Sequence, residues 1–379
     1  MVHVLLLVAC AVVIYLACEW FVNAVEWLGV ALKVGPLAVG TILAAAGTAL
    51  PESVVTLVAV TVDHGEQGKD VGVGAAMGGP LALSTIAYAV TGLVLLLRHR
   101  TGAARPLLAA LPAGPGPGGS VEAPGSGGSG GSGGSDGSGG PADPDVRPAG
   151  GRHGIGLERS VTDRLARDQV WFLAIFVVKV GLGLVAFAVK PWLGLLFFAM
   201  YGLYFWHEIR GGGEAGGEDL EPLKLLPARS RPPLWAVGVQ TLITLAVVFG
   251  ASQLFVAQLE WAGPALGLPA AVVALLLSPV ATELPEVMNA IIWVRAGKTR
   301  LALANISGAM MIQATVPSGL GLLFTSWRFD GPLLLSGLAT MAAISYLLAT
   351  MRAGRLTALR LTGAAGAYLV FAAGLVVLV

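Results

Sequence analysis

The chain has 379 residues, a mean hydropathy of +0.79, 55% hydrophobic residues and only 12% charged residues. Charged residues make up about 25% of a typical soluble domain, so the composition excludes a soluble globular protein and predicts an all-α integral membrane protein. The formal net charge of +1 gives no basic field for nucleic acid, and we expect no nucleic-acid partner.

Ten apolar segments follow one another along the chain, each close to the length of about 20 residues that crosses a bilayer as a helix. They predict ten transmembrane helices, near residues 3–32, 35–61, 71–97, 170–189, 191–207, 234–263, 267–293, 301–326, 331–350 and 357–379.

Two polar stretches interrupt this series. In the longer one, Gly-Ser repeats alternate with prolines, a composition that cannot bury a core and is typical of a disordered linker. The predicted organisation is therefore three spans of a first repeat over 1–112, a disordered cytoplasmic linker over 113–165, spans four and five over 166–210, a cytoplasmic connector over 211–233, and a second repeat of five spans over 234–379.

The loops indicate the orientation. If the N-terminus is outside, most of the 23 lysines and arginines lie in inside loops, and only Lys69, Lys190 and Arg328 lie outside, with Lys179 within a span. Because cytoplasmic loops carry an excess of Lys and Arg, we expect a multi-pass protein of the plasma (inner) membrane with both termini outside.

The two halves are duplicated. Segment 21–52 aligns with segment 255–286 without a gap, and 13 of the 32 positions are identical. Five spans per half place the second copy in the opposite orientation, so the sequence predicts two inverted five-helix repeats. Inverted repeats that meet near the bilayer midplane are typical of secondary transporters that work by alternating access.

One acid in each half lies deep inside a predicted span. Glu52 and Glu286 occupy matched places, and each directly follows a proline, Pro51 or Pro285. A carboxylate at that depth costs several kcal/mol unless it meets a partner, an ion or water, so it indicates a functional site.

Oxygen atoms accompany both acids. Pro51 and Pro285 cannot donate main-chain hydrogen bonds, which frees the carbonyls of Gly47 and Ala281, while Thr48 and Thr282 precede their glutamates by one turn. Hydroxyl, carbonyl and carboxylate oxygens are the ligands that Ca²⁺ and similar hard cations prefer. The alternative is that each proline only kinks its helix and the glutamate caps the break.

These motifs resemble a known family. The segments 47–52 (GTALPE) and 281–286 (ATELPE) are similar to the paired GTSLPE motifs of the sodium/calcium exchangers, in the cation/calcium antiporter superfamily. The resemblance implies ten spans, inverted repeats and a cation held by Glu52 and Glu286, with Thr48 and Thr282 beside them.

The chain also departs from the family pattern. The exchangers follow each acidic helix with a GSNIFN-like helix that supplies polar ligands. The matching stretches here, 78–83 and 308–313, retain a polar side chain at only one position, Gln313. Conversely, Glu283 replaces the usual serine of the second motif. If Glu283 faces the site, three carboxylates crowd together and one carries a proton in some states; if it faces a neighbouring helix, it pairs with a basic group.

We therefore expect a cation antiporter that exchanges Ca²⁺, or a similar cation, against Na⁺ or H⁺. A Na⁺/H⁺ or other monovalent cation exchanger and a non-transporting scaffold or sensor remain alternatives. Motifs of zinc proteases, ATP-driven pumps and α/β-hydrolases are absent, so we expect no enzyme, no catalytic residue and no cofactor. Partners are membrane lipid and inorganic cations, with no obligate protein partner. The candidate ligands are Glu52, Glu286, Thr48, Thr282, Glu283, Gln313, Gly47 and Ala281.

Overall fold

A computed structural model describes residues 2–61, 66–100, 157–185, 189–210, 220–265, 267 and 273–378. Helices form nearly all of this part of the chain, and it contains no strand, which confirms the all-α fold class. Most of the predicted linker, residues 113–156, and residues 211–219 of the connector lie outside the described residues.

In the first half, each predicted span coincides with one helix or with a run of contiguous helices. Short π-helical segments, η1 and η2, interrupt the second and third runs. The elements are α1 (Val2–Ala31); α2 (Pro36–Ala38), η1 (Val39–Ala44) and α3 (Ala45–Thr61); α4 (Glu66–Ala82), η2 (Leu83–Ala87) and α5 (Tyr88–Arg100); α6 (Arg159–Leu184); and η4 (Lys190–Trp192) with α7 (Leu193–Arg210).

The second half follows the same plan. Its elements are α8 (Leu234–Ala265); η5 (Val273–Leu277), α10 (Ser278–Thr282) and α11 (Leu284–Arg295); α12 (Thr299–Phe324); α13 (Gly331–Arg352); and α14 (Ala358–Gly363) with α15 (Ala365–Leu378). Within the described residues, six helices are long and apolar enough to cross a membrane on their own, and the bent pair α10–α11 adds a seventh if it counts as one span. That criterion thus counts fewer spans than the ten apolar segments of the sequence.

Helix α6 begins earlier than predicted. The linker was expected to continue to residue 165, but α6 already begins at Arg159. Two apolar side chains of its first turns, Val161 and Leu165, are buried in the main core. Burial against other helices supports this turn although its sequence is rich in charge, and a reading of hydropathy alone misses it.

The remaining part of the connector is packed against the helices. Leu223 is fully buried in a small cluster with Ala236 and Val237 of α8. The Asn23 side chain of α1 donates to the carbonyl of Pro222 (3.2 Å) and accepts from the main-chain N–H of Lys224 (3.0 Å). The second half of the connector therefore belongs to the folded body.

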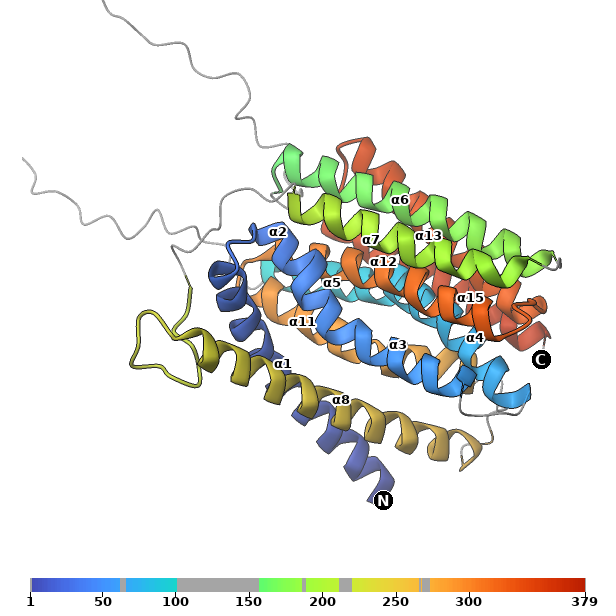
Figure 1. Ribbon diagram of the computed structural model, residues 1–379, viewed down its shortest axis with the longest axis horizontal. Helices are drawn as coiled ribbons and strands as arrows, with labels where there is room; N and C mark the ends of the chain where they lie inside the picture. Colours follow the sequence, from blue (N-terminus) through green and yellow to red (C-terminus); the bar gives the residue numbers. More distant parts are fainter. Residues whose placement is uncertain are drawn as a thin grey trace, which may run out of the picture.

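Helices α1 and α8 lie antiparallel along one side of the bundle, away from α6 and α7 (Figure 1). His3, near the start of α1, hydrogen-bonds Gln258 in the last part of α8 (2.7 Å), whereas Gln240, near the start of α8, donates to the carbonyl of Trp20 (2.8 Å). This antiparallel pairing of equivalent helices is the arrangement expected of inverted repeats.

The other contacts also come in matched pairs. Helix α12 packs on α3 and α7 of the first half, and the equivalent α4–α5 run packs on α11 and α14 of the second. We call the end of the bundle where α5 ends and α6, α8 and α12 begin the linker end; the two chain termini lie at the opposite end (Figure 1).

Helix α12 runs through the centre of the molecule and is buried along most of its length. Its Gly308 packs on η1 so closely that a Cβ atom there would lie 2.1 Å from the carbonyl oxygen of Thr41. Glycine permits this close approach of two backbones. The approach places the middle of α12 beside η1 and α3.

Candidate functional site

The second proline motif lies at a break between α10 and α11. The two segments meet at Glu283 with a bend of 50°. Pro285 in the first turn of α11 has no N–H to donate to the carbonyl of Ala281, so one helical hydrogen bond is missing at the bend. Glu286 follows in the same turn and is fully buried, near the positive end of the α11 dipole, which favours a carboxylate.

The first motif lies within α3. Thr48 is buried and donates its hydroxyl hydrogen to the carbonyl of Ala44 (3.2 Å). Thr282 of the second motif similarly donates to the carbonyl of Pro279 (3.1 Å). Because both hydrogens are used within their own helices, the lone pairs of the two hydroxyl oxygens remain for another ligand. Glu52 belongs to α3, but its side chain is outside those that the structure describes.

The two motifs meet at one small cavity of about 30 Å³, which is large enough for a water molecule or a bare cation. Gly47 and Thr48 of α3 line one side, Thr282 and Pro285 of the second motif line another, and α8 closes it. The residues of α8 are Leu245, Val248, Phe249, Ser252, Gln253 and Val256. Thr48 and its counterpart in the second repeat, Thr282, are thus brought together, as the duplication predicts.

Glu283 and Gln313 form a second polar pair next to this break. Both side chains are buried, and the Gln313 Nε2 donates to Glu283 Oε1 at 2.6 Å. A Cβ atom built on Gly79 of α4 would lie 2.6 Å from Glu283 Oε1 and 2.5 Å from Gln313 Oε1. Glu283 therefore lies between α10 and α12 against α4, and it accepts a hydrogen bond from the amide of Gln313.

This contact corrects the expected register of the third span. The stretch 78–83 was matched to 308–313, which pairs Leu83 with Gln313, but it is Gly79 that lies against Gln313. When the alignment of the two proline motifs is continued without a gap, Gly79 is also the position that corresponds to Gln313. Pro317 of α12 adds one more freed carbonyl, that of Gln313 itself.

Two residues of the α1–α8 pair escaped the sequence analysis. Ser252 of α8 lines the cavity, and Cys18 of α1 is fully buried with its Sγ 3.8 Å from the carbonyl oxygen of Pro285. The same gapless alignment, continued toward the N-terminus, makes Cys18 the counterpart of Ser252. The repeat was therefore the signal that could have found them, although the two residues differ in type.

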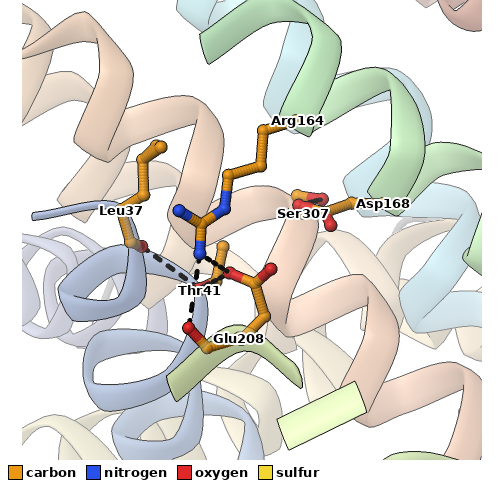
Figure 2. A network of polar contacts seen from close by, with 6 residues as sticks. All are labelled: Leu37, Thr41, Arg164, Asp168, Glu208 and Ser307. Atoms are coloured by element: carbon orange, nitrogen blue, oxygen red, sulfur yellow. Dashed lines mark hydrogen bonds and ion pairs between the residues drawn. The ribbon is translucent and has the colours of Figure 1, made fainter. Parts of the chain in front are cut away.

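A separate polar network occupies the linker end (Figure 2). Arg164 of α6 forms a salt bridge with the buried Glu208 of α7 (3.1 Å), and Thr41 of η1 donates to the same carboxylate oxygen (3.1 Å). Nearby, the buried Asp168 accepts a long hydrogen bond from Ser307 of α12 (3.5 Å). The network joins α6 and α7 to η1 and α12, and no residue of the proline motifs takes part in its described contacts.

Two further ion pairs lie toward the same end. Lys298 contacts Glu26 at 2.5 Å and Lys224 contacts Glu19 at 3.5 Å. The salt bridges of Arg164, Lys298 and Lys224 thus all lie toward the linker end.

Lys179 is a fully buried lysine in the last third of α6. Its Nζ donates to the carbonyl of Ala76 at 2.6 Å and lies 4.8 Å from the centre of the Phe176 ring. Ala76 lies one helical turn before Pro80 of α4, so this is the carbonyl that Pro80 leaves without an N–H partner.

The arrangement offers a hard cation hydroxyl and main-chain carbonyl oxygens from both halves, and among the described side chains it offers carboxylate oxygens from the second half. Within the described residues, no group of three or more His, Cys, Asp and Glu side chains is placed to hold a metal ion. Glu283 and Glu286 are two of the three expected carboxylates, and Glu52 is outside that search.

Comparison with known proteins identifies the family of the chain. The family model described as sodium/calcium exchanger protein matches residues 2–111 and 236–374. The matched regions contain both proline motifs, α1 and nearly all of α8, whereas α6 and α7 lie between them.

Solved structures of the sodium-calcium exchanger NCX_Mj are similar over nearly the whole chain. The form soaked with 10 mM Na⁺ and zero Ca²⁺ has a TM-score of 0.64 and 15% identity and covers 97% of both chains; the form soaked with 2.5 mM Na⁺ and 0.1 mM Ca²⁺ has a TM-score of 0.65 and 14% identity and covers 98% of this chain and 97% of the other. At this identity the likeness shows the fold. No protein with a curated function matches the chain.

Proposed function

Because this chain belongs to the sodium/calcium exchanger family, whose members are membrane transporters rather than enzymes, we propose that it exchanges Ca²⁺, or a similar cation, against Na⁺ or H⁺ across the membrane. The observation that carries the proposal is the single cavity lined by Gly47 and Thr48 from one half and by Thr282 and Pro285 from the other. One site built by two opposed repeats can be opened alternately to either side.

The proposed ligands combine residues that line the cavity, Gly47, Thr48 and Thr282, with their neighbours in the two proline motifs. Glu52 and Glu286 supply the negative charge, and the hydroxyls of Thr48 and Thr282 supply neutral oxygens. The freed carbonyls of Gly47 and Ala281 complete a hard oxygen shell, and the pair of Glu283 and Gln313 adds a carboxylate and an amide next to it. Exchange follows because two cations that compete for the same acids cannot be carried together.

Alternating access needs a moving part, and the packing favours α1 and α8. These two helices contact each other more extensively than either contacts the rest of the bundle. Helix α8 closes one side of the cavity with apolar residues such as Val248 and Phe249. A sliding motion of the α1–α8 pair would cover the site from one side of the membrane and uncover it from the other.

Glu283 supports coupling to protons. Its carboxylate is buried and occupies the space beside Gly79, where the chain lacks a side chain. If Glu52 and Glu286 face the same cavity, repulsion between three carboxylates favours one protonated acid when no cation is bound. The same site then exchanges a divalent cation for protons, and a Na⁺/H⁺ exchanger is the second candidate for this reason.

We place the protein in the plasma (inner) membrane with both termini outside and the linker end at the cytoplasm, because most lysines and arginines of the loops lie at that end. Lipid and inorganic cations are its proposed partners, with no cofactor.

The test is uptake of radioactive Ca²⁺ by the full chain reconstituted in lipid vesicles. Uptake is driven first by an outward Na⁺ gradient and then by an outward proton gradient, and Glu52→Gln is the matched variant. We expect uptake under at least one gradient, and we expect the variant to abolish it. The absence of uptake under both gradients, with folded protein in the vesicles, would overturn Ca²⁺ exchange. Uptake of Na⁺ driven by protons in the same vesicles would instead identify a monovalent cation exchanger.

A further inference from the structure

Ser252 lies on the face of α8 that closes the cavity. The residue is only 8% exposed, and its hydroxyl has no hydrogen-bond partner among the described residues. A buried hydroxyl without a partner costs about 1–3 kcal/mol, so buried polar groups are normally paired. An unpaired hydroxyl that lines a cavity between the two repeats therefore points to a ligand that enters the cavity.

The other hydroxyls of the cavity behave differently. The hydroxyls of Thr48 and Thr282 donate hydrogen bonds to main-chain carbonyls of their own helices, with oxygen–oxygen distances of 3.2 and 3.1 Å. Ser252 makes no such bond, although hydroxyls of the same helix, those of Thr241 and Thr244, do. Its hydroxyl group can rotate, so an oxygen lone pair can turn toward a cation in the cavity.

The equivalent positions of the two repeats carry different residue types. Cys18 is the equivalent of Ser252 in α1, and its thiol lies 3.8 Å from the carbonyl of Pro285. Thiols suit soft metals, whereas hydroxyl oxygens suit Ca²⁺ and Na⁺. The two matched positions thus differ in chemistry, and only the copy on α8 carries a ligand for a hard cation.

We propose that the hydroxyl oxygen of Ser252 is a ligand of the transported cation, supplied by α8 in addition to the ligands of the two proline motifs. The inference rests on the proposed function, because it assigns a further residue to the same site. A ligand on the moving helix makes coordination depend on the position of α8, so the cation is held more tightly when α8 covers the cavity.

The experiment compares Ser252→Ala with Ser318→Ala in the full-length protein. Ser318 of α12 is also fully buried with an unpaired hydroxyl but does not line the cavity, so it controls for the loss of a buried hydroxyl. Ca²⁺ affinity is measured by calorimetry in detergent, and the concentration dependence of uptake is measured in vesicles. We expect Ser252→Ala to weaken both about tenfold, the effect of one lost polar contact, and Ser318→Ala to leave both within twofold of the wild type.

A second variant keeps the test decisive if Ser252→Ala fails to fold. Ser252→Cys retains the size of the side chain and replaces oxygen by sulfur, so we expect Cd²⁺ to compete with Ca²⁺ at least tenfold better than in the wild type. Cys10 and Cys18 are present in both proteins and cancel in the comparison.

The outcomes separate the two proposals. If the wild type transports Ca²⁺ while Ser252→Ala and Ser252→Cys both match it in Ca²⁺ affinity and Cd²⁺ competition, the ligand role of Ser252 is wrong and the exchange function stands. If the wild type neither binds nor transports Ca²⁺, both proposals fail.

Discussion

Two prolines, Pro80 and Pro285, each leave a helical carbonyl without its N–H partner, but their surroundings differ. We call the position at Pro80 the filled break and the position at Pro285 the open break. In α4, Pro80 frees the carbonyl of Ala76, and the Nζ of Lys179 donates to that carbonyl at 2.6 Å, so the helix runs on into η2. Between α10 and α11, Pro285 is accompanied by a 50° bend, a buried glutamate and a cavity. A proline thus leaves a carbonyl oxygen without its helical partner in both places, and the neighbouring helix determines which group contacts that oxygen.

The difference separates a structural device from a transport site. The Nζ of Lys179 on α6 satisfies the freed carbonyl of α4 permanently, because it is covalently part of the chain and cannot leave. At Pro285 the neighbouring helix α8 offers the hydroxyl of Ser252, among apolar side chains, and a space of about 30 Å³. An exchangeable cation needs such a space, since it must enter and leave during every cycle.

The largest effect is expected at the acid of the open break. Glu286→Gln removes the negative charge but keeps the shape of the side chain, and we expect uptake to fall at least 100-fold because a neutral amide cannot balance a bound cation. The measurement is Ca²⁺ uptake in vesicles. Glu26→Gln is the control, since Glu26 forms an ion pair with Lys298 near the linker end; it should retain more than half of the uptake. Equal loss in both variants would contradict a special role of the break.

An intermediate effect is expected at Gly79, which directly precedes Pro80 on α4 and lies against Glu283, the residue at which α10 and α11 meet. Gly79→Ala places a methyl group within 2.6 Å of Glu283 Oε1 and Gln313 Oε1. Both are ends of flexible side chains, so the protein should fold but the pair must move, and we expect the Ca²⁺ affinity to fall about tenfold. Gly74→Ala on the same helix meets only Leu275, at 3.9 Å, and should leave the affinity unchanged. Calorimetry of both variants sharpens the comparison; an unchanged affinity in Gly79→Ala would exclude Glu283 and Gln313 from the site.

At the filled break we expect a loss of stability rather than of affinity. Lys179→Met keeps the length of the side chain but leaves the Ala76 carbonyl unsatisfied, which costs about 1–3 kcal/mol. The measurement is thermal unfolding in detergent without Ca²⁺, together with the Ca²⁺ affinity, which should stay within twofold of the wild type. A changed affinity with unchanged stability would place Lys179 in the transport site and remove the distinction between the two breaks.

No effect is expected from shortening the Gly-Ser-rich segment between α5 and α6. Removal of residues 116–145, within the Gly-Ser linker, should leave the rate and the affinity of uptake unchanged, because its composition cannot form a packed structure. Loss of uptake in the shortened protein would show that the linker has a regulatory role.

The helical fold could be predicted from the sequence because a bilayer leaves a chain few choices. A segment of about 20 apolar residues becomes a helix, since its backbone polar groups must be satisfied internally. The duplication added the inverted arrangement, and the antiparallel contacts of α1 with α8 agree with it. The start of α6 escaped this reasoning because the burial of Val161 and Leu165 depends on other helices.

The candidate site was predictable only in part. The proline, threonine and glutamate of each motif are local signals, and the structure brings Thr48 and Thr282 to one cavity. The contact of Gly79 with Gln313 and the position of Ser252 on that cavity depend on how three helices meet. The alignment of the two repeats relates Gly79 to Gln313 and Cys18 to Ser252, but a change of residue type hides both relations from a search for identities.

By itself the sequence determined that the protein is helical, lies in a membrane, is duplicated and carries an acid after a proline in each half. Each of these properties depends on local composition or on spacing along one chain. Only the tertiary structure decided which proline break is closed by Lys179 and which opens into a cavity, and that Arg164 pairs with Glu208. These outcomes depend on side chains that lie far apart in the sequence and meet only when the helices pack.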